Sequence, residues 1–342
     1  MPDGRWSLDA APPSLSQAGD PALGQMQSDT AATGLALLAY LGAGYTHRSE
    51  RYRTVVDRGL TWLIDRQRPD GDLFTGGNRF TRLYSHGIGA IALCEAYGMT
   101  RDLRLREPAS RAIRFVVDAQ SPELGGWHYV PREESDTSVT GWQLMAMASA
   151  RMSGLDVPEA SLAKVDQWLD LAGSPDGARY AYNPHAAGTP QQVAGRWPNL
   201  PMTAEGLLMR MYQGWPSSNP SLRTGADYLL ANLPEQGTAE QPRRDAYYWY
   251  YATQVMFHME GTYWNAWNER LRPMLERTQV RGGPWAGSWH PTEPVPDRWG
   301  AAAGRLYVTA MHLLVLEVYY RHLPLFRHPQ LRDPLFRHPR PK

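Results

Sequence analysis

Cysteine and lysine are almost absent from this chain of 342 residues. Its one cysteine, Cys94, excludes an intramolecular disulfide framework and a zinc site built from several cysteines. Lys164 and Lys342 are the only lysines, so arginine supplies nearly all of the positive side-chain charge. The 35 basic and 34 acidic residues leave a net charge of +1, which argues against nucleic-acid binding through bulk charge.

Long hydrophobic runs and a secretion signal are also missing. No apolar run reaches the roughly 18 residues that a membrane-spanning helix needs. Residues Met1 to Trp6 lack the basic-then-apolar pattern of a signal peptide. A hydrophobic fraction of 42% is enough for a large folded core. We therefore expect a soluble protein of the cytoplasm, and peripheral contact with a membrane stays open.

Phenylalanine is scarce among the aromatic residues, with 6 positions against 13 tryptophans and 18 tyrosines. Tryptophan and tyrosine combine an apolar ring with a polar atom that needs a partner. This composition favours a wet cavity or stacked loops over a dry core.

Helical periodicity dominates the chain, and one kind of helix start recurs. The segment Asp29-Thr30-Ala31-Ala32-Thr33-Gly34 matches Asp136-Thr137-Ser138-Val139-Thr140-Gly141, and in both the aspartate is expected to cap the helix. An apolar stretch follows each start, which predicts helices on the inside of the fold. The expected inner helices are 27–45, 84–99, 136–153, 202–214, 244–261 and 305–321.

A second, more amphipathic kind of helix alternates with the first. Several of these helices end in glutamine, followed by a loop of glycine and an aromatic residue, as in Gln120, Gly125 and Trp127. The alternation predicts repeated helical hairpins. The expected outer helices are 53–67, 108–120, 159–172, 219–233 and 263–279.

Both ends of the chain depart from this pattern. Gly4-Arg5-Trp6 looks like the loop after an outer helix, yet no helix precedes it, so either an upstream helix is missing or another element fills its place. Near the other end, Pro324-Leu325-Phe326-Arg327-His328-Pro329 recurs as residues 334–339, and its prolines forbid a helix. We therefore expect a helical domain over 1–322 and a disordered tail over 323–342. The tail is either a duplicated terminus or a basic arm for membrane phosphates or a partner.

The glutamine, glycine and tryptophan loops, alternating with capped inner helices, resemble the repeats of the squalene cyclase and protein prenyltransferase superfamily. The resemblance runs from Gly4 to about Pro324, and Gln120-x4-Gly125-x-Trp127 is its best match. In that superfamily, outer helices enclose inner helices around a central cavity. The resemblance therefore implies an all-α fold, a single α/α toroid of about six helical hairpins, with one N-terminal helix missing unless another element replaces it.

The acid motif of the resembled cyclases is only partly present. Squalene–hopene type cyclases protonate an alkene with the middle aspartate of Asp-x-Asp-Asp-Thr, and the nearest stretch here is Glu133-Glu134-Ser135-Asp136-Thr137. Ser135 takes the position of the proton donor, and a serine hydroxyl cannot protonate an alkene. Asp136, Glu134 or Glu133 would have to supply an acid that an apolar pocket keeps neutral. The alternative is that Asp136 only caps its helix.

Two other activities of toroid proteins need residues that this chain lacks. The resembled prenyltransferases bind zinc through Asp-x-Cys and a later histidine, but Ser138 takes the cysteine position, and the candidates for the histidine are Tyr247 and Tyr248. The thioester toroids need Cys-x-Glu-Gln, which Cys94-Glu95-Ala96-Tyr97 does not provide. Because the histidines also form no ligand pair at helical spacing, we expect no cofactor and no metal.

An aromatic helix and one histidine complete the candidate site. The residues from Tyr247 to Tyr251 are all aromatic, and some must face the ring centre, with Tyr248, Tyr251 and Gln254 expected on one face. Such rings would stabilise a carbocation, line an apolar site or fill the centre. His86 is either an acid–base group or a hydrogen-bonded residue of a helix start. The candidate catalytic residues are Asp136, Glu134, Glu133 and His86, and the candidate substrate-binding residues are Tyr84, Trp142, Tyr247, Tyr248, Trp249, Tyr251 and Gln254.

Two functions remain open. The first is a zinc-independent enzyme, similar to a terpenoid cyclase or prenyltransferase, acting on a polyprenyl chain of the squalene type inside the ring. The second is a non-catalytic toroid that binds an isoprenoid-like hydrophobic molecule or a protein partner. A carbohydrate-active α/α barrel is a weaker third. A deep apolar cavity with a buried carboxylate would favour the enzyme, a packed centre the scaffold, and an open groove with paired carboxylates the glycosidase.

Overall fold

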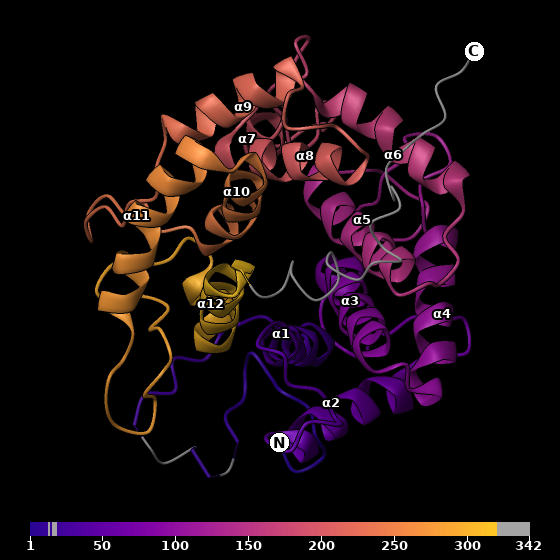
Figure 1. Ribbon diagram of the computed structural model, residues 1–342, viewed down its shortest axis with the longest axis vertical. Helices are drawn as coiled ribbons and strands as arrows, with labels where there is room; N and C mark the ends of the chain where they lie inside the picture. The colour runs from indigo at the N-terminus through magenta and orange to yellow at the C-terminus, as the bar shows by residue number, and fades with distance from the viewer. Residues whose placement is uncertain (13, 16–18, 320–342) are drawn as a thin grey trace.

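A computed structural model describes residues 1–12, 14–15 and 19–319, and within these residues the helices form a closed ring (Figure 1). This confirms the expected all-α toroid. The inner helices are α1 (Asp29–Gly42), α3 (Arg82–Thr100), α5 (Thr137–Met152), α8 (Leu200–Tyr212), α10 (Ala246–Met259) and α12 (Gly300–Leu316). The outer helices are α2 (Arg53–Arg66), α4 (Leu103–Asp118), α6 (Glu159–Ala172), α9 (Pro220–Leu230) and α11 (Gly261–Thr278). A 3-10 turn, η1 (Arg79–Thr81), and the short α7 (Pro190–Ala194) lie in connecting loops.

Side-chain caps explain where four of the inner helices begin. In each case a short polar side chain accepts a hydrogen bond from a backbone N–H of the first turn, which would otherwise have no partner. The expectation for Asp29 is wrong, because Ser28 caps α1 and Asp29 pairs with Arg5 at 3.2 Å. The four caps are Ser28, Asp136, Asn199 and Asp245.

Two helices begin five residues earlier than the sequence pattern indicates. α4 starts at Leu103 because Asp102 accepts a hydrogen bond from the Arg104 N–H, and Pro108 lies inside the helix instead of at its start. α12 starts at Gly300 and contains a break at Gly304, whose φ is 77°. A residue without a Cβ adopts this conformation without steric cost.

Two of the glutamine loops, those at Gln67 and Gln120, connect an outer helix to the next one through hydrogen bonds. Gln120 Nε2 donates to the carbonyl of Gly125 at 2.7 Å, in its own loop, and to the carbonyl of Ser161 at 2.9 Å, on α6. Trp127 Nε1 then donates back to the carbonyl of Val116 on α4 at 2.8 Å. The loop motif therefore specifies the stacking of repeats and leaves the chemistry to other residues.

A glycine with positive φ lets three of these loops approach the following outer helix. A Cβ on Gly71 or Gly125 would lie 2.2 Å from a backbone carbonyl oxygen of α4 or α6. Gly4, with φ of 96°, meets α2 in the same way, because its Cβ would lie 2.5 Å from the carbonyl oxygen of Arg58. The interpretation of Gly4-Arg5-Trp6 as a repeat loop is confirmed by this contact.

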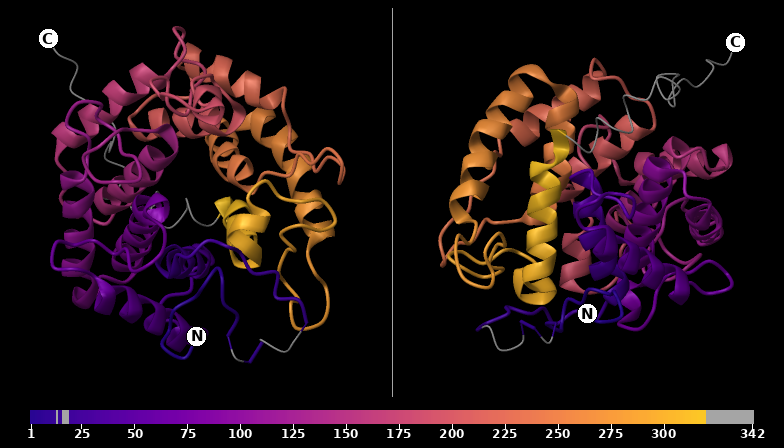
Figure 2. Two further views of the ribbon diagram at one scale, coloured as in Figure 1. Left: turned by 180° about the vertical axis from the view of Figure 1, so that it is seen from behind. Right: turned by 60° about the horizontal axis from the view of Figure 1, so that its bottom comes forward.

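The ring closes where α12 packs against α1, and an extended N-terminal segment reinforces the closure. The N–H groups of Gln25 and Met26 donate to the carbonyl of Ala302 at 2.7 and 2.9 Å, and the Arg305 N–H donates to Ala22 at 2.9 Å. Figures 1 and 2 show this segment beside the loop that follows α11. The proline-rich tail lies outside the described residues.

All inner helices run in the same direction because an outer helix returns the chain between them. Their N-termini, and the long loops before them, therefore lie at one end of the ring. We call this the loop end. The outer helices begin at the opposite end.

Candidate functional site

A chain of buried hydroxyl and carboxyl groups connects four inner helices near the loop end. The Tyr84 hydroxyl, on α3, donates to Ser138 Oγ on α5 at 2.8 Å. Ser138 Oγ lies 2.5 Å from the Tyr247 hydroxyl on α10, which contacts both carboxyl oxygens of Glu205 on α8 at 3.0 and 3.2 Å. Two of these residues, Tyr84 and Tyr247, were expected at the site from the sequence.

Glu205 fits into the ring because the facing helix has no side chain at one position. A Cβ on Gly141 of α5 would lie 2.0 Å from Glu205 Oε1. The Glu205 side chain is fully buried, and burial raises its pKa well above the ordinary value, although the bond from Tyr247 lowers it. Asp136 raises it further, so the two carboxyl groups influence each other's protonation.

Asp136 is held between two loops at the start of α5. Its backbone N–H donates to the carbonyl of Trp127 at 2.8 Å, and the next residue, Thr137, donates from N–H and Oγ1 to the carbonyls of Tyr182 and Ala181 at 2.9 and 2.6 Å. The loops before α5 and α8 therefore fix the position of the carboxyl group.

The two carboxyl oxygens of Asp136 have different environments. Oδ1 accepts the capping hydrogen bond from the Val139 N–H at 2.7 Å. Oδ2 is buried without a hydrogen-bond partner and lies 3.6 Å from His128 Nε2. Burial raises the pKa of Asp136 to about 8, against the opposing effects of the helix N–H groups and of the nearby Tyr182 hydroxyl, and the charge of Glu134 raises it further. Asp136 is therefore a carboxylic acid that keeps its proton at neutral pH.

Aromatic side chains from the loops enclose this acid. The hydroxyls of Tyr129 and Tyr182 lie 2.5 Å apart, and the ring centres of Tyr84 and Tyr129 lie 6.2 Å apart. Burial raises the pKa of both loop tyrosines, and the nearby Asp136 raises it further, so both stay protonated hydroxyl donors. We call the group the acid cluster, made of Tyr84, His128, Tyr129, Asp136, Ser138, Tyr182, Glu205 and Tyr247.

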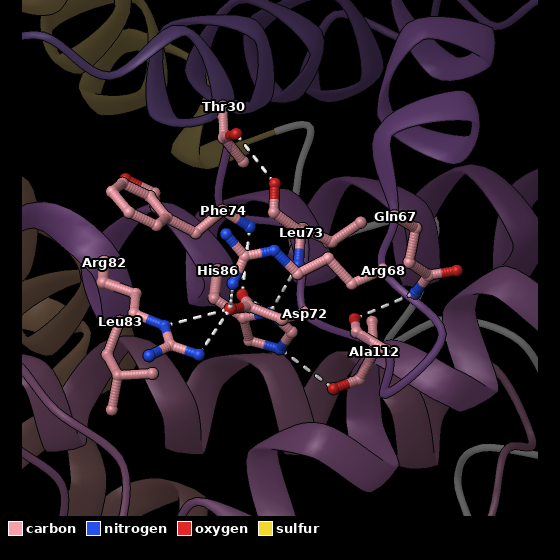
Figure 3. Close-up of polar contacts among 12 residues, drawn as sticks. Thr30, Gln67, Arg68, Asp72, Leu73, Phe74, Arg82, Leu83, His86 and Ala112 are labelled. Carbon is pink, nitrogen blue, oxygen red and sulfur yellow. Dashed lines mark hydrogen bonds and ion pairs between the residues drawn. The ribbon is translucent and has the colours of Figure 1, made fainter. Parts of the chain in front are cut away.

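His86 lies outside the acid cluster and has both ring nitrogens engaged (Figure 3). Nδ1 accepts from the Leu73 N–H at 3.1 Å, and Nε2 lies 2.9 Å from the carbonyl of Ala112. The neighbouring carboxylate of Asp72 is buried and lies 2.8 Å from Arg82. Burial raises the pKa of Asp72, but His86, the Phe74 N–H and Arg82 together outweigh it and hold that pKa below the ordinary value. His86 on α3 therefore connects the loop that contains Leu73 to helix α4.

Two other expected catalytic residues, Glu133 and Glu134, are exposed in the loop before α5. Burial lowers the pKa of His128, and the charges of these two glutamates offset part of that lowering. Ser135 Oγ, which takes the position of the usual proton donor, accepts from the Gly126 N–H at 3.2 Å. The position of the proton donor in the resembled cyclases therefore holds the loop here, and Asp136 is the buried acid of this stretch.

The aromatic helix α10 divides its rings between the inside and the outside of the ring. Tyr251 contacts Tyr247 with ring centres 4.9 Å apart, and Trp142 stacks against Tyr250 at 5.8 Å. Tyr248 instead points outward, and its hydroxyl donates to the carbonyl of Asn232 at 2.9 Å. The expected common face of Tyr248, Tyr251 and Gln254 is therefore wrong, because Tyr247 and Tyr251 form the inner pair.

The remaining two candidates also lie away from the acid. Trp249 stacks on His312 of α12 with ring centres 5.8 Å apart. Gln254 Nε2 donates to the carbonyl of Tyr250 at 3.3 Å.

Besides Ser138, which the sequence placed only at the cysteine position of a zinc motif, sequence reasoning missed four members of the acid cluster: His128, Tyr129, Tyr182 and Glu205. Glu205 is part of an expected helix start, and a glutamate there is usually exposed. The signal that could have identified it is Gly141, a glycine inside the facing helix. The other three come from loops, whose conformation leaves no periodic pattern in the sequence.

A pocket of about 230 Å³ lies elsewhere, between α10, α11 and α12, with Trp264, Trp267 and Tyr319 among its walls. In the described part of the chain, no three His, Cys, Asp or Glu side chains gather in an arrangement that could hold a metal ion. No helix among the same residues is long and apolar enough to cross a membrane.

Solved structures with a similar fold include a mannanase and a cellobiose epimerase. The α-1,6-mannanase GH76A from a Salegentibacter species superposes with a TM-score of 0.61 at 13% identity, over 90% of this chain and 94% of the mannanase. Cellobiose 2-epimerase from Spirochaeta thermophila has a TM-score of 0.61 at 13% identity, over 92% of this chain and 88% of the epimerase. The chain is an α/α toroid. At this identity, the likeness shows the fold alone.

A sequence comparison identifies a different kind of relative. Drimenyl diphosphate synthase from Streptomyces showdoensis is 28% identical over 155 residues, which are 45% of this chain and 28% of that enzyme. The match therefore covers little more than a quarter of the length of that curated relative. No family model matches the chain.

Proposed function

We propose that this toroid is an isoprenoid cyclase-like enzyme that starts its reaction by protonating an alkene, with Asp136 as the proton donor. The observation that carries the proposal is a fully buried carboxyl group whose pKa is raised to about 8. A general acid must hold its proton at the working pH, and burial in an apolar site is one way to achieve this.

The reaction would begin with transfer of the proton from Asp136 Oδ2 to one carbon of a C=C bond. The alkene's electron pair forms the new C–H bond, and the other alkene carbon becomes a cation that the faces of nearby aromatic rings stabilise. A second alkene of the same chain attacks the cation, and loss of a proton at the end restores a C=C bond. The product is an isomer of the substrate, because one proton is gained and one is lost.

The carboxylate left on Asp136 would be stabilised by groups already in place. Oδ1 accepts the Val139 N–H at the N-terminus of α5, where the helix dipole favours negative charge. His128 lies 3.6 Å from Oδ2, and 19% of its side chain is exposed. His128 can therefore take a proton from solvent and return it to Asp136. Burial lowers the pKa of His128, and the charges of the exposed Glu134 and Glu133 offset part of that lowering.

The substrate class rests on the sequence relative and on the chemistry of the acid cluster. The relative is named as a synthase of an isoprenoid diphosphate. A linear prenyl diphosphate or squalene offers alkenes that a carboxylic acid surrounded by aromatic rings can protonate. The mannanase and the epimerase share the fold at 13% identity, which supports no transfer of a sugar substrate to this chain.

A second candidate function is a toroid that binds a hydrophobic ligand or a protein partner without chemistry. The observation in its favour is that Asp136 already has a structural role as the cap of α5. The tight packing of Trp142, Tyr250 and Tyr251, each at most 2% exposed, also agrees with a filled ring centre.

The two candidates are separated by incubating the purified protein with squalene and with linear prenyl diphosphates, then identifying the products by mass spectrometry. The enzyme proposal expects a cyclised isomer that Asp136→Asn forms at least about a hundred-fold more slowly. Asp245→Asn is the matched control, because Asp245 caps α10 by the same kind of hydrogen bond, from the N–H three residues on, but lies outside the acid cluster. Unchanged substrates together with a co-purifying isoprenoid would support the binding protein instead.

A further inference from the structure

Three exposed pairs of arginine and an aromatic residue lie at the loop end of the ring. Each pair immediately precedes or begins an inner helix, and the helices concerned are α3, α8 and α12, which alternate around the ring. The aromatic residues Phe80, Trp197 and Trp299 are 48%, 70% and 42% exposed. The pairs are Arg79-Phe80, Arg196-Trp197 and Arg298-Trp299.

The arginine of each pair stays close to its ring or loop and remains exposed. The guanidinium of Arg79 lies 5.0 Å from the centre of the Phe80 ring, and that of Arg298 lies 5.9 Å from the Trp299 ring. Arg196 Nε donates to the carbonyl of Ala186 at 2.5 Å. Each tip therefore combines a large apolar surface with a positive charge.

We propose that these three tips, Phe80, Trp197 and Trp299 with their arginines, dock the loop end on the surface of a lipid bilayer. Aromatic rings with polar neighbours are favoured at the boundary between hydrocarbon and headgroups. Guanidinium groups bind the lipid phosphates in two-pronged hydrogen bonds. The tips would enter the boundary region while the ring itself stays outside.

The spacing of the tips favours a bilayer over a protein partner. A protein interface normally covers one continuous patch with an apolar centre. The tips instead stand on separate loops, before alternate inner helices of the ring, so a partner that contacts all three must be an extended surface. Further exposed apolar residues are Val193, at 37%, in the connection before α8, and Leu23, at 40%, in the segment before α1.

The proposed docking surface leads directly to the acid cluster. The Phe80 ring meets the Tyr129 ring edge-on, with centres 5.2 Å apart, and the Tyr129 hydroxyl contacts Tyr182. A hydrophobic substrate dissolved in the bilayer would therefore reach the ring at the end where Asp136 lies. This last step rests on the proposed function, whereas binding to the bilayer does not.

Flotation of the full-length protein with lipid vesicles tests the surface. The vesicles consist of phosphatidylcholine alone or of phosphatidylcholine with phosphatidylglycerol. The wild type is expected to float with both, and the triple variant Phe80→Ser, Trp197→Ser, Trp299→Ser is expected to bind about tenfold more weakly. The control is Leu103→Ser, because Leu103 is 75% exposed but lies at the opposite end, at the start of α4. It should bind like the wild type.

The arginines are tested separately with Arg79→Gln, Arg196→Gln and Arg298→Gln combined. This variant is expected to lose the extra affinity for vesicles with phosphatidylglycerol and to keep binding to phosphatidylcholine. The proposal is overturned if the wild type binds neither vesicle, or if the triple aromatic variant floats as well as the wild type. Because the vesicles contain no isoprenoid, a failure here leaves the cyclase assay with detergent-dissolved substrate as an independent result.

Discussion

Replacing Asp136 with asparagine should change how stability depends on pH. In an unfolded chain the carboxyl group of Asp136 ionises near pH 3.8, whereas in the folded protein its pKa is about 8. Between these values, the unfolded state has lost the proton and the folded state still holds it. Stability from this group is therefore full below about pH 4 and is lost as the pH rises toward 8.

The size of the effect follows from the same two pKa values. Each unit of pKa difference corresponds to about 1.4 kcal/mol. Raising the pH from 5 to 8 should thus lower the unfolding free energy of the wild type by roughly 3 to 4 kcal/mol through Asp136 alone. This is a large part of the 5–15 kcal/mol that is usual for folded proteins. Asparagine does not ionise, so this part of the pH dependence should disappear in Asp136→Asn.

Urea unfolding of the wild type and of Asp136→Asn at pH 5 and pH 8 measures this difference. Other groups that titrate, such as Asp297 with a pKa of about 6, affect both proteins alike and largely cancel in the comparison. Asp136→Ala is a useful second variant. It also abolishes the titration, but it removes the cap of α5 and should cost about 1 kcal/mol more than asparagine at either pH. Parallel loss of stability in the wild type and in Asp136→Asn would refute the reasoning, since it would mean that Asp136 is already ionised in the folded protein at pH 5.

Three further predictions concern other buried groups, and urea unfolding measures each of them. Gln120→Ala should cost about 3 kcal/mol because three hydrogen bonds are lost, whereas Gln279→Ala, which loses a single exposed bond, should cost less than half of that; equal losses would contradict the role assigned to the loop motif. His312→Phe should keep or raise stability at pH 7, because both ring nitrogens are buried without partners. Burial lowers the pKa of His312, so the wild type should lose stability as the pH falls below about 6.5. His312→Phe should lose less stability over the same pH range. An equal loss in both proteins would contradict the burial of His312 as a neutral side chain. Glu205→Gln should be less sensitive than the wild type to a rise in pH, because burial raises the pKa of Glu205 and glutamine does not ionise; identical pH profiles would show that Glu205 is ionised.

The ring of helices could be predicted from the sequence because its determinants are local. The Gln120, Gly125 and Trp127 loop specifies hydrogen bonds within a few residues and to the next outer helix, so the motif indicates both the turn and the stacking. Helix boundaries were less accurate where a competing local signal existed. Asp102 starts α4 ahead of Pro108, and Ser28 instead of Asp29 caps α1.

The acid cluster could be predicted only in part, because it depends on contacts between distant repeats. The partial acid motif indicated Asp136, and the run of five aromatic residues indicated Tyr247. Glu205 did not, since its burial depends on the space that Gly141 leaves on another helix. The outward direction of Tyr248 likewise depends on the register of α10, which a run of five aromatic residues does not determine.

The measurement that tests the central claim most directly is incubation of the protein with linear prenyl diphosphates in deuterated water, with the product analysed by mass spectrometry. Because the carboxyl proton of Asp136 exchanges with solvent, the first C–H bond formed should carry deuterium. We expect a cyclised isomer that is one mass unit heavier than the product made in ordinary water, present with Asp245→Asn and absent with Asp136→Asn. A product without deuterium, or one that Asp136→Asn forms equally fast, would contradict the assignment of Asp136 as the proton donor.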